Sequence, residues 1–209
     1  MINLLTVKVG NKYNSQHVNR LVKSFKTAHE FKAYCITDDP TGLDANIQAI
    51  QPSLKVPGWW NKVQLFSPDM PQGRQIYFDL DMVLLGSFDQ LLSGHQTHAA
   101  KDPYRWQGCE LNSSFIIWDS WLFRDIYLDF EQDPYFKIKH CPGGDQQYIG
   151  RYIWRPKWTK HIASYKKDIQ PTNKIPPGAL AINFHGQPKP DEIMNDPQHP
   201  FHEQLKQIW

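Results

Sequence analysis

The chain has 209 residues, of which 23 are Lys or Arg and 21 are Asp or Glu, so its formal net charge at pH 7 is only +2. This near balance gives no electrostatic argument for binding nucleic acid, and the lack of an apolar run close to the roughly 20 residues of a bilayer span excludes an integral membrane protein. Aromatic residues make up 13% of the chain, far more than a chain too polar to collapse would carry, which excludes intrinsic disorder.

Strand and helix patterns alternate through the first half of the chain. Runs rich in β-branched and aromatic residues predict strands at 2–9, 31–36 and 47–50. Ser15 is the predicted N-cap of a helix, because apolar residues follow it at i, i+3, i+4 and i+7, namely Val18, Leu21, Val22 and Phe25. A short helix is predicted at 59–66, before the most apolar stretch at 75–88. This alternation predicts a mostly parallel sheet with helices on both faces and a ligand site at the carboxyl ends of the strands.

The second half of the chain is less regular. A strand is predicted at 111–118, helices at 121–130 and 144–151, and a late strand at 179–185. Neither an internal repeat nor a Gly/Ser linker divides the sequence, so we expect a single α/β domain over 1–209.

The cysteines indicate a reducing compartment. Cys35, Cys109 and Cys141 are far apart, odd in number and without CxxC spacing, which indicates neither a disulfide framework nor a thiolate zinc site. The N-terminus has no basic segment followed by a long apolar run, so no signal peptide is predicted. The expected location is the cytoplasm.

Two carboxylates interrupt the most apolar stretch, at Asp79-Leu80-Asp81. On an extended chain they point to one side, together with Gln75 and Tyr77. Burying two acids this close is costly unless a partner compensates their charge, and oxygen ligands of this kind suit Mg²⁺ or Mn²⁺. The alternative is a pair of aspartates that end a strand and face water. The apolar residues directly after Asp81 favour the metal site, because a solvated turn normally has Gly, Asn or Pro there.

With these motifs the sequence resembles the metal-dependent glycosyltransferases of the GT-A fold, and among them family 8, the relatives of glycogenin and of bacterial galactosyltransferases. The resemblance spans nearly the whole chain, and the motifs that carry it occur in the family's order. They are the loop 6–13, Thr37-Asp38-Asp39, Trp60-Asn61-Lys62, Asp79-Leu80-Asp81, Asn112-Ser113-Ser114, Gly144-Asp145-Gln146 and the segment 185–190, His-Gly-Gln-Pro-Lys-Pro. The last motif is shorter than in the family, and Ser114 stands where the family often has Gly.

The resemblance implies that a sugar is moved from a nucleotide-sugar donor, a UDP-hexose or UDP-pentose, with retention of the anomeric configuration. It implies a Rossmann-like fold with a nucleotide-binding half, 1–110, and an acceptor and sugar half, 111–209. Asp79, Asp81 and His185 would hold the metal, and their mixed oxygen and nitrogen set favours Mn²⁺ over Mg²⁺.

The resemblance also assigns the substrate contacts. The nucleotide and its diphosphate would contact Thr6, Lys8, Tyr13, Asp38, Asp39, Leu80, Gly186 and Lys189. The donor sugar would contact Lys62, Asn112, Ser113 and Asp145, and the reacting centre would lie near Asp145 and Gln146.

Structural interpretations stay open beside these assignments. Asp145 could serve only as a helix N-cap, His185 as a hydrogen-bonded structural histidine, and Tyr13 as a packing residue. Asn112 and Ser113 could close a turn, Asp38 and Asp39 could cap the turn into Pro40, and Lys62 could be a solvated helix residue.

Two other functions use some of the same features. A metal-dependent phosphatase of the haloacid dehalogenase type also carries Asp-x-Asp after a strand, but that motif belongs near the N-terminal strand. A non-catalytic carbohydrate-binding module would use the aromatic residues as stacking platforms, but it gives the aspartate pair no purpose. Asp102, Glu110 and Asp145 remain open as a general base for an inverting reaction.

The acceptor is not identified by the sequence. Aromatic and basic residues gather at 154–167 and at Tyr104-Arg105-Trp106, where they could stack a glycan or a lipid-linked glycan or simply pack in the protein. A protein or a modified DNA base is also an open acceptor, the latter a minority hypothesis. The sequence does not determine an oligomeric state.

Overall fold

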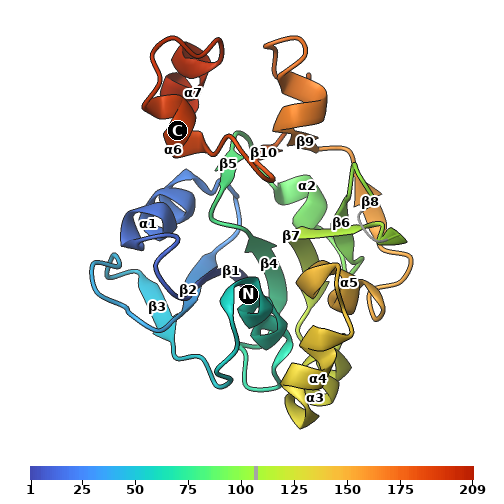
Figure 1. Cartoon of the computed structure of the whole chain (residues 1–209). Helices are drawn as coiled ribbons and strands as arrows, with labels where there is room; N and C mark the ends of the chain where they lie inside the picture. The colour runs from blue at the N-terminus through green and yellow to red at the C-terminus, as the bar shows by residue number, and fades with distance from the viewer. Residues whose placement is uncertain (106–107) are drawn as a thin grey trace.

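The fold is built on a seven-stranded sheet (Figure 1), described for residues 1–105 and 108–209 of a computed structural model. The strand order is β3-β2-β1-β4-β7-β6-β8, formed by β1 (Ile2–Lys8), β2 (Phe31–Thr37), β3 (Ile47–Ile50), β4 (Arg74–Phe78), β6 (His98–Lys101), β7 (Leu111–Asp119) and β8 (Lys157–Thr159). Antiparallel pairing involves β7 with its two neighbours, and the other pairs are parallel. The expected mostly parallel sheet is confirmed.

Both faces of this sheet are buried, because neighbouring residues of each strand pack into different cores. Leu4 and Ile76 join the core beneath α1 (Ser15–Ser24) and α2 (Asp89–Leu92), whereas Leu5 and Tyr77 join the core on the opposite face. That second face is covered by η1 (Gly58–Phe66), α3 (Arg124–Gln132) and α5 (Gly144–Gly150), with α4 (Pro134–Lys139) beside them. The alternation of side chains along a strand thus produces two apolar layers.

A smaller lobe at one end of the sheet has a core of its own (Figure 1). It contains a second, three-stranded sheet of order β5-β10-β9, with β5 (Met82–Leu84), β9 (Ile162–Ser164), β10 (Ala181–Asn183), the π-helix η3 (Tyr165–Ile169), α6 (Pro190–Met194) and α7 (His202–Ile208). Tyr165, Phe184 and Phe201 are fully buried there. Because β5 follows β4 after a short turn, the turn 79–81 connects the two sheets.

Most predicted elements form, with shifts at their ends. The strand at 47–50 and the short helix after Pro57 are found as predicted, the latter as a 3₁₀ helix. The helix expected at 121–130 begins later, at Arg124, and the late strand is limited to Ala181–Asn183. The first helix is capped by Asn14, not by Ser15, because the Asn14 side chain accepts a hydrogen bond from the amide of Gln16 at 3.1 Å.

No helix within the described residues is long and apolar enough to cross a membrane.

Candidate active site

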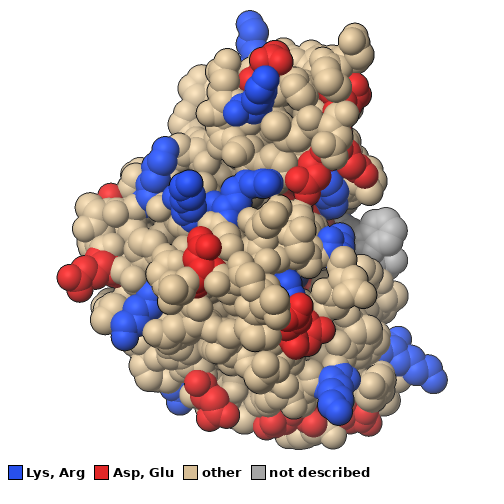
Figure 2. All heavy atoms as spheres, turned by 90° about the vertical axis from the view of Figure 1, so that its left-hand side faces the viewer, with Lys and Arg blue, Asp and Glu red and all other residues tan. Residues whose placement is uncertain are grey.

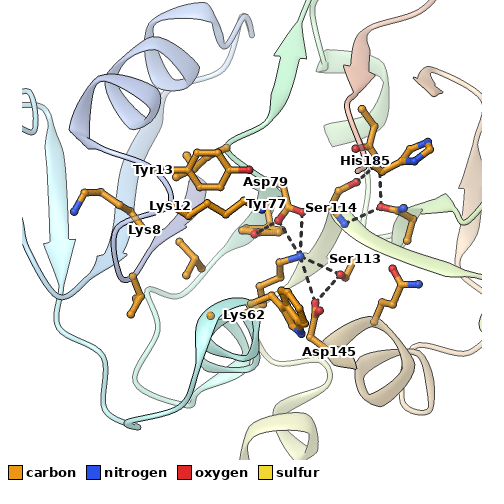
Figure 3. Close-up of a pocket in the computed structure, with 18 of the residues that line it drawn as sticks. Lys8, Lys12, Tyr13, Lys62, Tyr77, Asp79, Ser113, Ser114, Asp145 and His185 are labelled. Atoms are coloured by element: carbon orange, nitrogen blue, oxygen red, sulfur yellow. Dashed lines mark hydrogen bonds and ion pairs between the residues drawn. The ribbon is translucent and has the colours of Figure 1, made fainter. Parts of the chain in front are cut away.

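A cavity of about 390 Å³ lies where β1 and β4 end and β7 begins (Figure 3). Because β7 runs antiparallel to β4, its first residues lie at the edge of the sheet where β4 ends. Eleven residues predicted for the site line the cavity: Lys8, Tyr13, Lys62, Asp79, Leu80, Asn112, Ser113, Asp145, Gln146, His185 and Gly186. Residues from both halves of the chain therefore converge at the edge of the sheet predicted for a ligand.

The two aspartates lie on a tight turn, so the prediction that they share one face of an extended strand is wrong. Strand β4 ends at Phe78, and the amide of Met82 donates to the carbonyl of Asp79 at 3.2 Å, which closes the turn before β5. The amide of Asp79 donates to the carbonyl of Ser114 at 2.9 Å, which fixes the turn against β7. At this turn the chain passes from the large sheet to the small one.

Lys62 is the central group on one side of the cavity (Figure 3). Its buried Nζ lies 2.9 Å from Asp79 Oδ1, 3.3 Å from Asp145 Oδ2 and 3.2 Å from Ser113 Oγ. Burial alone would lower the pKa of Lys62, but Asp145 and Asp79 reverse this effect and hold its pKa above its ordinary value. Lys62 therefore stays charged and is not the solvated residue of the structural alternative.

Asp79 and Asp145 are both held by hydroxyl groups as well. Tyr77 donates a short hydrogen bond to Asp79, and Ser113 Oγ donates to Asp145 Oδ2 at 2.6 Å. Burial raises the pKa of Asp79 against the opposing effect of Lys62. Asp145 does not cap its helix, since the N-cap of α5 is Gly143 and makes no side-chain cap bond. Its carboxylate instead belongs to the cluster in the cavity.

Asp81 is paired with the loop that follows β10. Lys189 Nζ makes a short ion pair with Asp81 Oδ2 and donates to the carbonyl of Phe184 at 2.7 Å, while Tyr13 donates to the same Asp81 oxygen at 3.1 Å. The Asp81 and Lys189 side chains are only 10% and 17% exposed. Asp81 and Lys189 do not line the main cavity. Lys189 lines a neighbouring cavity, and Tyr13 and Gly186 line both.

His185 points away from Asp79 in this structure (Figure 3). Its Nε2 lies 2.6 Å from Ser164 Oγ, and its ring makes an edge contact with Tyr104. Burial, together with nearby Lys166, lowers the pKa of His185, so the ring is neutral at pH 7. A neutral imidazole can ligate a metal, but here it is occupied by a hydrogen bond.

The residues predicted around the nucleoside hold the first loops together. Lys8 Nζ donates to the carbonyl of Asp39 at 2.9 Å and lies 3.4 Å from Thr37 Oγ1. Asp38 Oδ2 accepts from the amide of Gly10 at 3.0 Å, and Asp39 Oδ1 accepts from the amide of Thr41. Thr6, Asp38 and Asp39 do not line the main cavity, whereas Lys8 and Tyr13 do.

The start of β7 forms the remaining wall. Asn183 Nδ2 donates to Ser114 Oγ at 2.8 Å and to Asn112 Oδ1 at 3.2 Å, which links β7 to β10. Gln146 Nε2 donates to Asp102 Oδ2 at 2.7 Å. Asn112 and Ser113 are therefore strand residues, and neither closes a turn.

The fold matches solved glycosyltransferase structures over nearly the whole chain. An active-site mutant of LgtC and the galactosyltransferase LgtC in complex with donor and acceptor sugar analogs align with TM-scores of 0.69 and 0.68 and identities of 12% and 13%, covering 99% of this chain and 94% of each LgtC chain. GlyE from Streptococcus pneumoniae TIGR4 aligns with a TM-score of 0.72 and 13% identity, over 100% of this chain and 60% of GlyE. The chain has the fold of these glycosyltransferases.

These matches and the strand order confirm the predicted fold class, a GT-A fold, and the resemblance inferred from the motifs. No family model and no curated protein matches the sequence. LgtC and GlyE, which share this fold, are glycosyltransferases.

The GT-A cavity also contains residues that the motifs did not identify as site residues. Lys12 extends into it from the loop that carries Tyr13 (Figure 3). Asn183 lies two residues before His185, and this strand spacing could have indicated it. Trp59 and Tyr77 also line the cavity, although the motifs assign neither of them a role at the site. Lys12 lies in the loop 6–13 that carries part of the resemblance, but a lysine in a polar loop is usually solvated, so it was not assigned to the site.

The aromatic and basic segments proposed for an acceptor lie outside this cavity. Trp154 and Trp158 line a separate pocket with Arg151 and Arg155, and Lys167 Nζ lies 4.6 Å from the centre of the Tyr104 ring. Trp106, the third member of the group at 104–106, lies outside the described residues.

The carboxylates of the turn suit a divalent cation, and in this structure their partners are the ammonium groups of two lysines. Asp79 and Asp81 supply carboxylates of the kind that Mg²⁺ and Mn²⁺ accept, and each is paired with a lysine, Lys62 or Lys189. Across 1–105 and 108–209, no three His, Cys, Asp or Glu residues come together as a metal-holding group. The fit of the site to a divalent cation thus rests on the two carboxylates of the turn, and the cation would replace Lys62 and Lys189 as their charged partner.

Proposed function

We propose that this protein is a glycosyltransferase that moves a sugar from a nucleotide-sugar donor to an acceptor. The observation that carries the proposal is the Asp79-Leu80-Asp81 turn at the carboxyl edge of a GT-A sheet, where Asp79 contacts Lys62, the partner of Asp145, and Asp81 contacts Lys189. A site that handles a diphosphate through one cation and a few lysines needs no basic surface. This agrees with the net charge of +2.

Asp79, Asp81 and His185 are the residues that would hold a divalent cation, and we favour Mn²⁺ over Mg²⁺ because the set mixes oxygen and nitrogen. The cation would neutralise the charge that develops on the departing diphosphate. Lys189, already at the turn, would supply a second positive charge to the same phosphates. The short loop at Gly186, whose φ is +70°, lets the backbone approach closely.

The other residues predicted for the site would orient the donor. Lys8, Tyr13 and Lys12 lie on the side of the cavity formed by the first strand, which suits the nucleoside end. Asp38 and Asp39 support that side by fixing its loops, and Thr6 is a buried residue of β1 that would contact the nucleotide from the same side. Lys62, Asn112, Ser113 and Asp145 lie on the opposite wall, which suits the hydroxyl groups of the sugar.

In the reaction, an acceptor hydroxyl oxygen bonds to the anomeric carbon and the bond from that carbon to the phosphate oxygen breaks. The hydroxyl proton passes to the departing diphosphate. Asp145 and Gln146 are the residues we place nearest the reacting carbon, and Lys62 and Ser113 hold Asp145 in position. We propose retention of the anomeric configuration and a UDP-hexose or UDP-pentose donor, both from the family resemblance. The free cysteines agree with the predicted cytoplasmic location.

The test is donor binding and hydrolysis with matched variants. UDP together with Mn²⁺ is expected to raise the melting temperature, and a screen of UDP-sugars is expected to find one that is hydrolysed in a metal-dependent way. Asp81→Ala and His185→Ala are expected to abolish that turnover, whereas the exposed controls Asp125→Ala and His29→Ala are expected to retain it. Absence of stabilisation by any nucleoside diphosphate with metal would refute the proposal, and full activity of either site variant would remove that residue from the metal site.

A further inference from the structure

Trp59 is a large apolar side chain left exposed at the cavity. It lines the cavity and is 60% exposed, whereas Trp60, the next residue, is 5% exposed and stacks on Phe130 in the core. The two indoles of this helix therefore have different tasks. One stabilises the fold, and the other contributes little to the core.

The geometry of η1 aligns Trp59 with the charged cluster. A 3₁₀ helix has three residues per turn, so side chains three positions apart lie on the same face. Trp59 and Lys62 are separated by three positions in η1, and Lys62 reaches Asp79 and Asp145. Trp59 thus stands one helical turn from the lysine that we place at the donor sugar.

Gly144 fixes the indole on its other side. A Cβ atom at Gly144 would lie 3.1 Å from Trp59 Nε1, and the φ of Gly144 is +75°, a conformation that favours glycine. The indole therefore packs against the backbone directly before Asp145. It is held beside the residues of the reacting centre while much of its surface stays open to solvent.

We propose that Trp59 is the platform for a saccharide acceptor, with one face of a pyranose ring stacked on the indole and its hydroxyl directed to the donor sugar. The inference rests on the proposed function and adds the class of the acceptor. Indole rings combine a broad apolar surface with a polar N–H, which matches the mixed face of a sugar.

A saccharide fits this rim better than a nucleic acid does. Nucleic acid binding depends on lysines and arginines that contact phosphates. Lys62, one helical turn from Trp59, is already paired with two carboxylates, and the other lysines of the cavity, Lys8 and Lys12, lie on the side formed by the first strand. On the side of the molecule that carries α1, several Lys and Arg side chains lie together between the body and the small lobe (Figure 2).

The experiment compares Trp59→Ala and Trp59→Phe with Trp121→Ala, a control on another exposed tryptophan, which is 54% exposed and lines none of the described cavities near the site. Methyl glycosides of common hexoses serve as acceptor probes. Each is added singly, together with Mn²⁺ and the intact UDP-sugar that the donor screen identifies as a substrate. The readouts are the acceptor KM, the rate of donor hydrolysis without acceptor, and the stabilisation by UDP with Mn²⁺.

At least one methyl glycoside is expected to accelerate UDP release. Trp59→Ala is expected to raise the KM of that glycoside about tenfold, the size of a lost stacking contact, with a much smaller effect on donor hydrolysis. Trp59→Phe should recover most of the loss, and Trp121→Ala should match the wild type.

Three results would overturn the inference: no acceleration by any glycoside, an unchanged acceptor KM in Trp59→Ala, or an equal loss of donor hydrolysis and transfer. Acceleration by single-stranded DNA in place of the glycosides would also overturn it. Each of these outcomes leaves the proposed function standing if the wild type still hydrolyses the donor, whereas no hydrolysis and no stabilisation by UDP would mean that the proposed function itself has failed.

Discussion

Replacing Lys62 with methionine removes the ammonium group from between Asp79 and Asp145 and keeps a side chain of similar length. The two carboxylates then lose a partner that lies 2.9 and 3.3 Å away. Removing one partner of a buried ion pair costs about 3–5 kcal/mol, and each kcal/mol corresponds to about 2–4 °C in melting temperature for a domain of this size. Because Asp79 is 24% exposed, water recovers part of the loss, and we expect the lower part of the resulting range, a fall of about 6–12 °C.

Thermal unfolding and urea unfolding at pH 7 measure this effect. The control is Lys137→Met, which removes an ion pair of 2.6 Å to Asp129, whose side chain is 35% exposed, and which should cost at most about 1 kcal/mol. Combining Lys62→Met with Asp79→Asn should cost less than the sum of the single changes, because the second removes a charge that the first leaves unpaired. A melting temperature of Lys62→Met that falls no more than that of the control would show that the cluster is not an ion-pair network in solution.

Three further outcomes are expected. Lys189→Met should bind Mn²⁺ alone about tenfold more tightly, measured by titration calorimetry, because the substitution removes the ammonium group paired with Asp81. The same variant should bind UDP together with Mn²⁺ more weakly. An unchanged affinity for Mn²⁺ would contradict the proposal that Asp81 holds the metal. Burial lowers the pKa of His98 from 6.5 to about 4, so its neutral ring stabilises the fold above pH 6.5 and this contribution is lost as the pH falls toward 4. His98→Phe should flatten this decline in the free energy of unfolding, measured with urea between pH 7 and pH 4. A decline as steep as in the wild type would contradict the assignment. Gly144→Ala should lower the free energy of unfolding by about 1–2 kcal/mol, because alanine disfavours the left-handed backbone there, and should raise the acceptor KM by displacing Trp59. The control is Gly94→Ala, with a similar φ of +76° and no atom within 4 Å of the new Cβ, which should show only the backbone effect. Equal acceptor KM values in the two variants would contradict the contact between Gly144 and Trp59.

The sequence was sufficient for the parts of the site that depend on local pattern. The Asp79-Leu80-Asp81 motif is recognisable because charge within an apolar run is unusual, and the strand before it follows from its composition. The turn itself was missed, because an alternating pattern does not indicate where a strand leaves its sheet. The turn is joined to β7 by a hydrogen bond to Ser114, 35 positions further along the chain.

Long-range pairing explains the other differences. Lys62 and Lys189 were placed at the sugar and the diphosphate, but their ion pairs with Asp79 and Asp81 join residues 17 and 108 positions apart. Lys8 is predicted to contact the nucleotide, and its ammonium also donates to the carbonyl of Asp39, on the loop after the neighbouring strand. No periodicity carries such information, because these contacts arise only after strands from distant segments become neighbours.

The small lobe links remote packing to the chemistry of the phosphates. The loop from Phe184 to Lys189 leaves β10 and enters α6, and α6 rests on α7 through a core that contains fully buried Phe201 and Leu205. On the outer side, Asp191 holds the lobe to His17 of α1 at 2.6 Å. A cavity-forming substitution at Phe201 would therefore weaken the contact that we propose between Lys189 and the diphosphate, although Phe201 does not line the candidate active site.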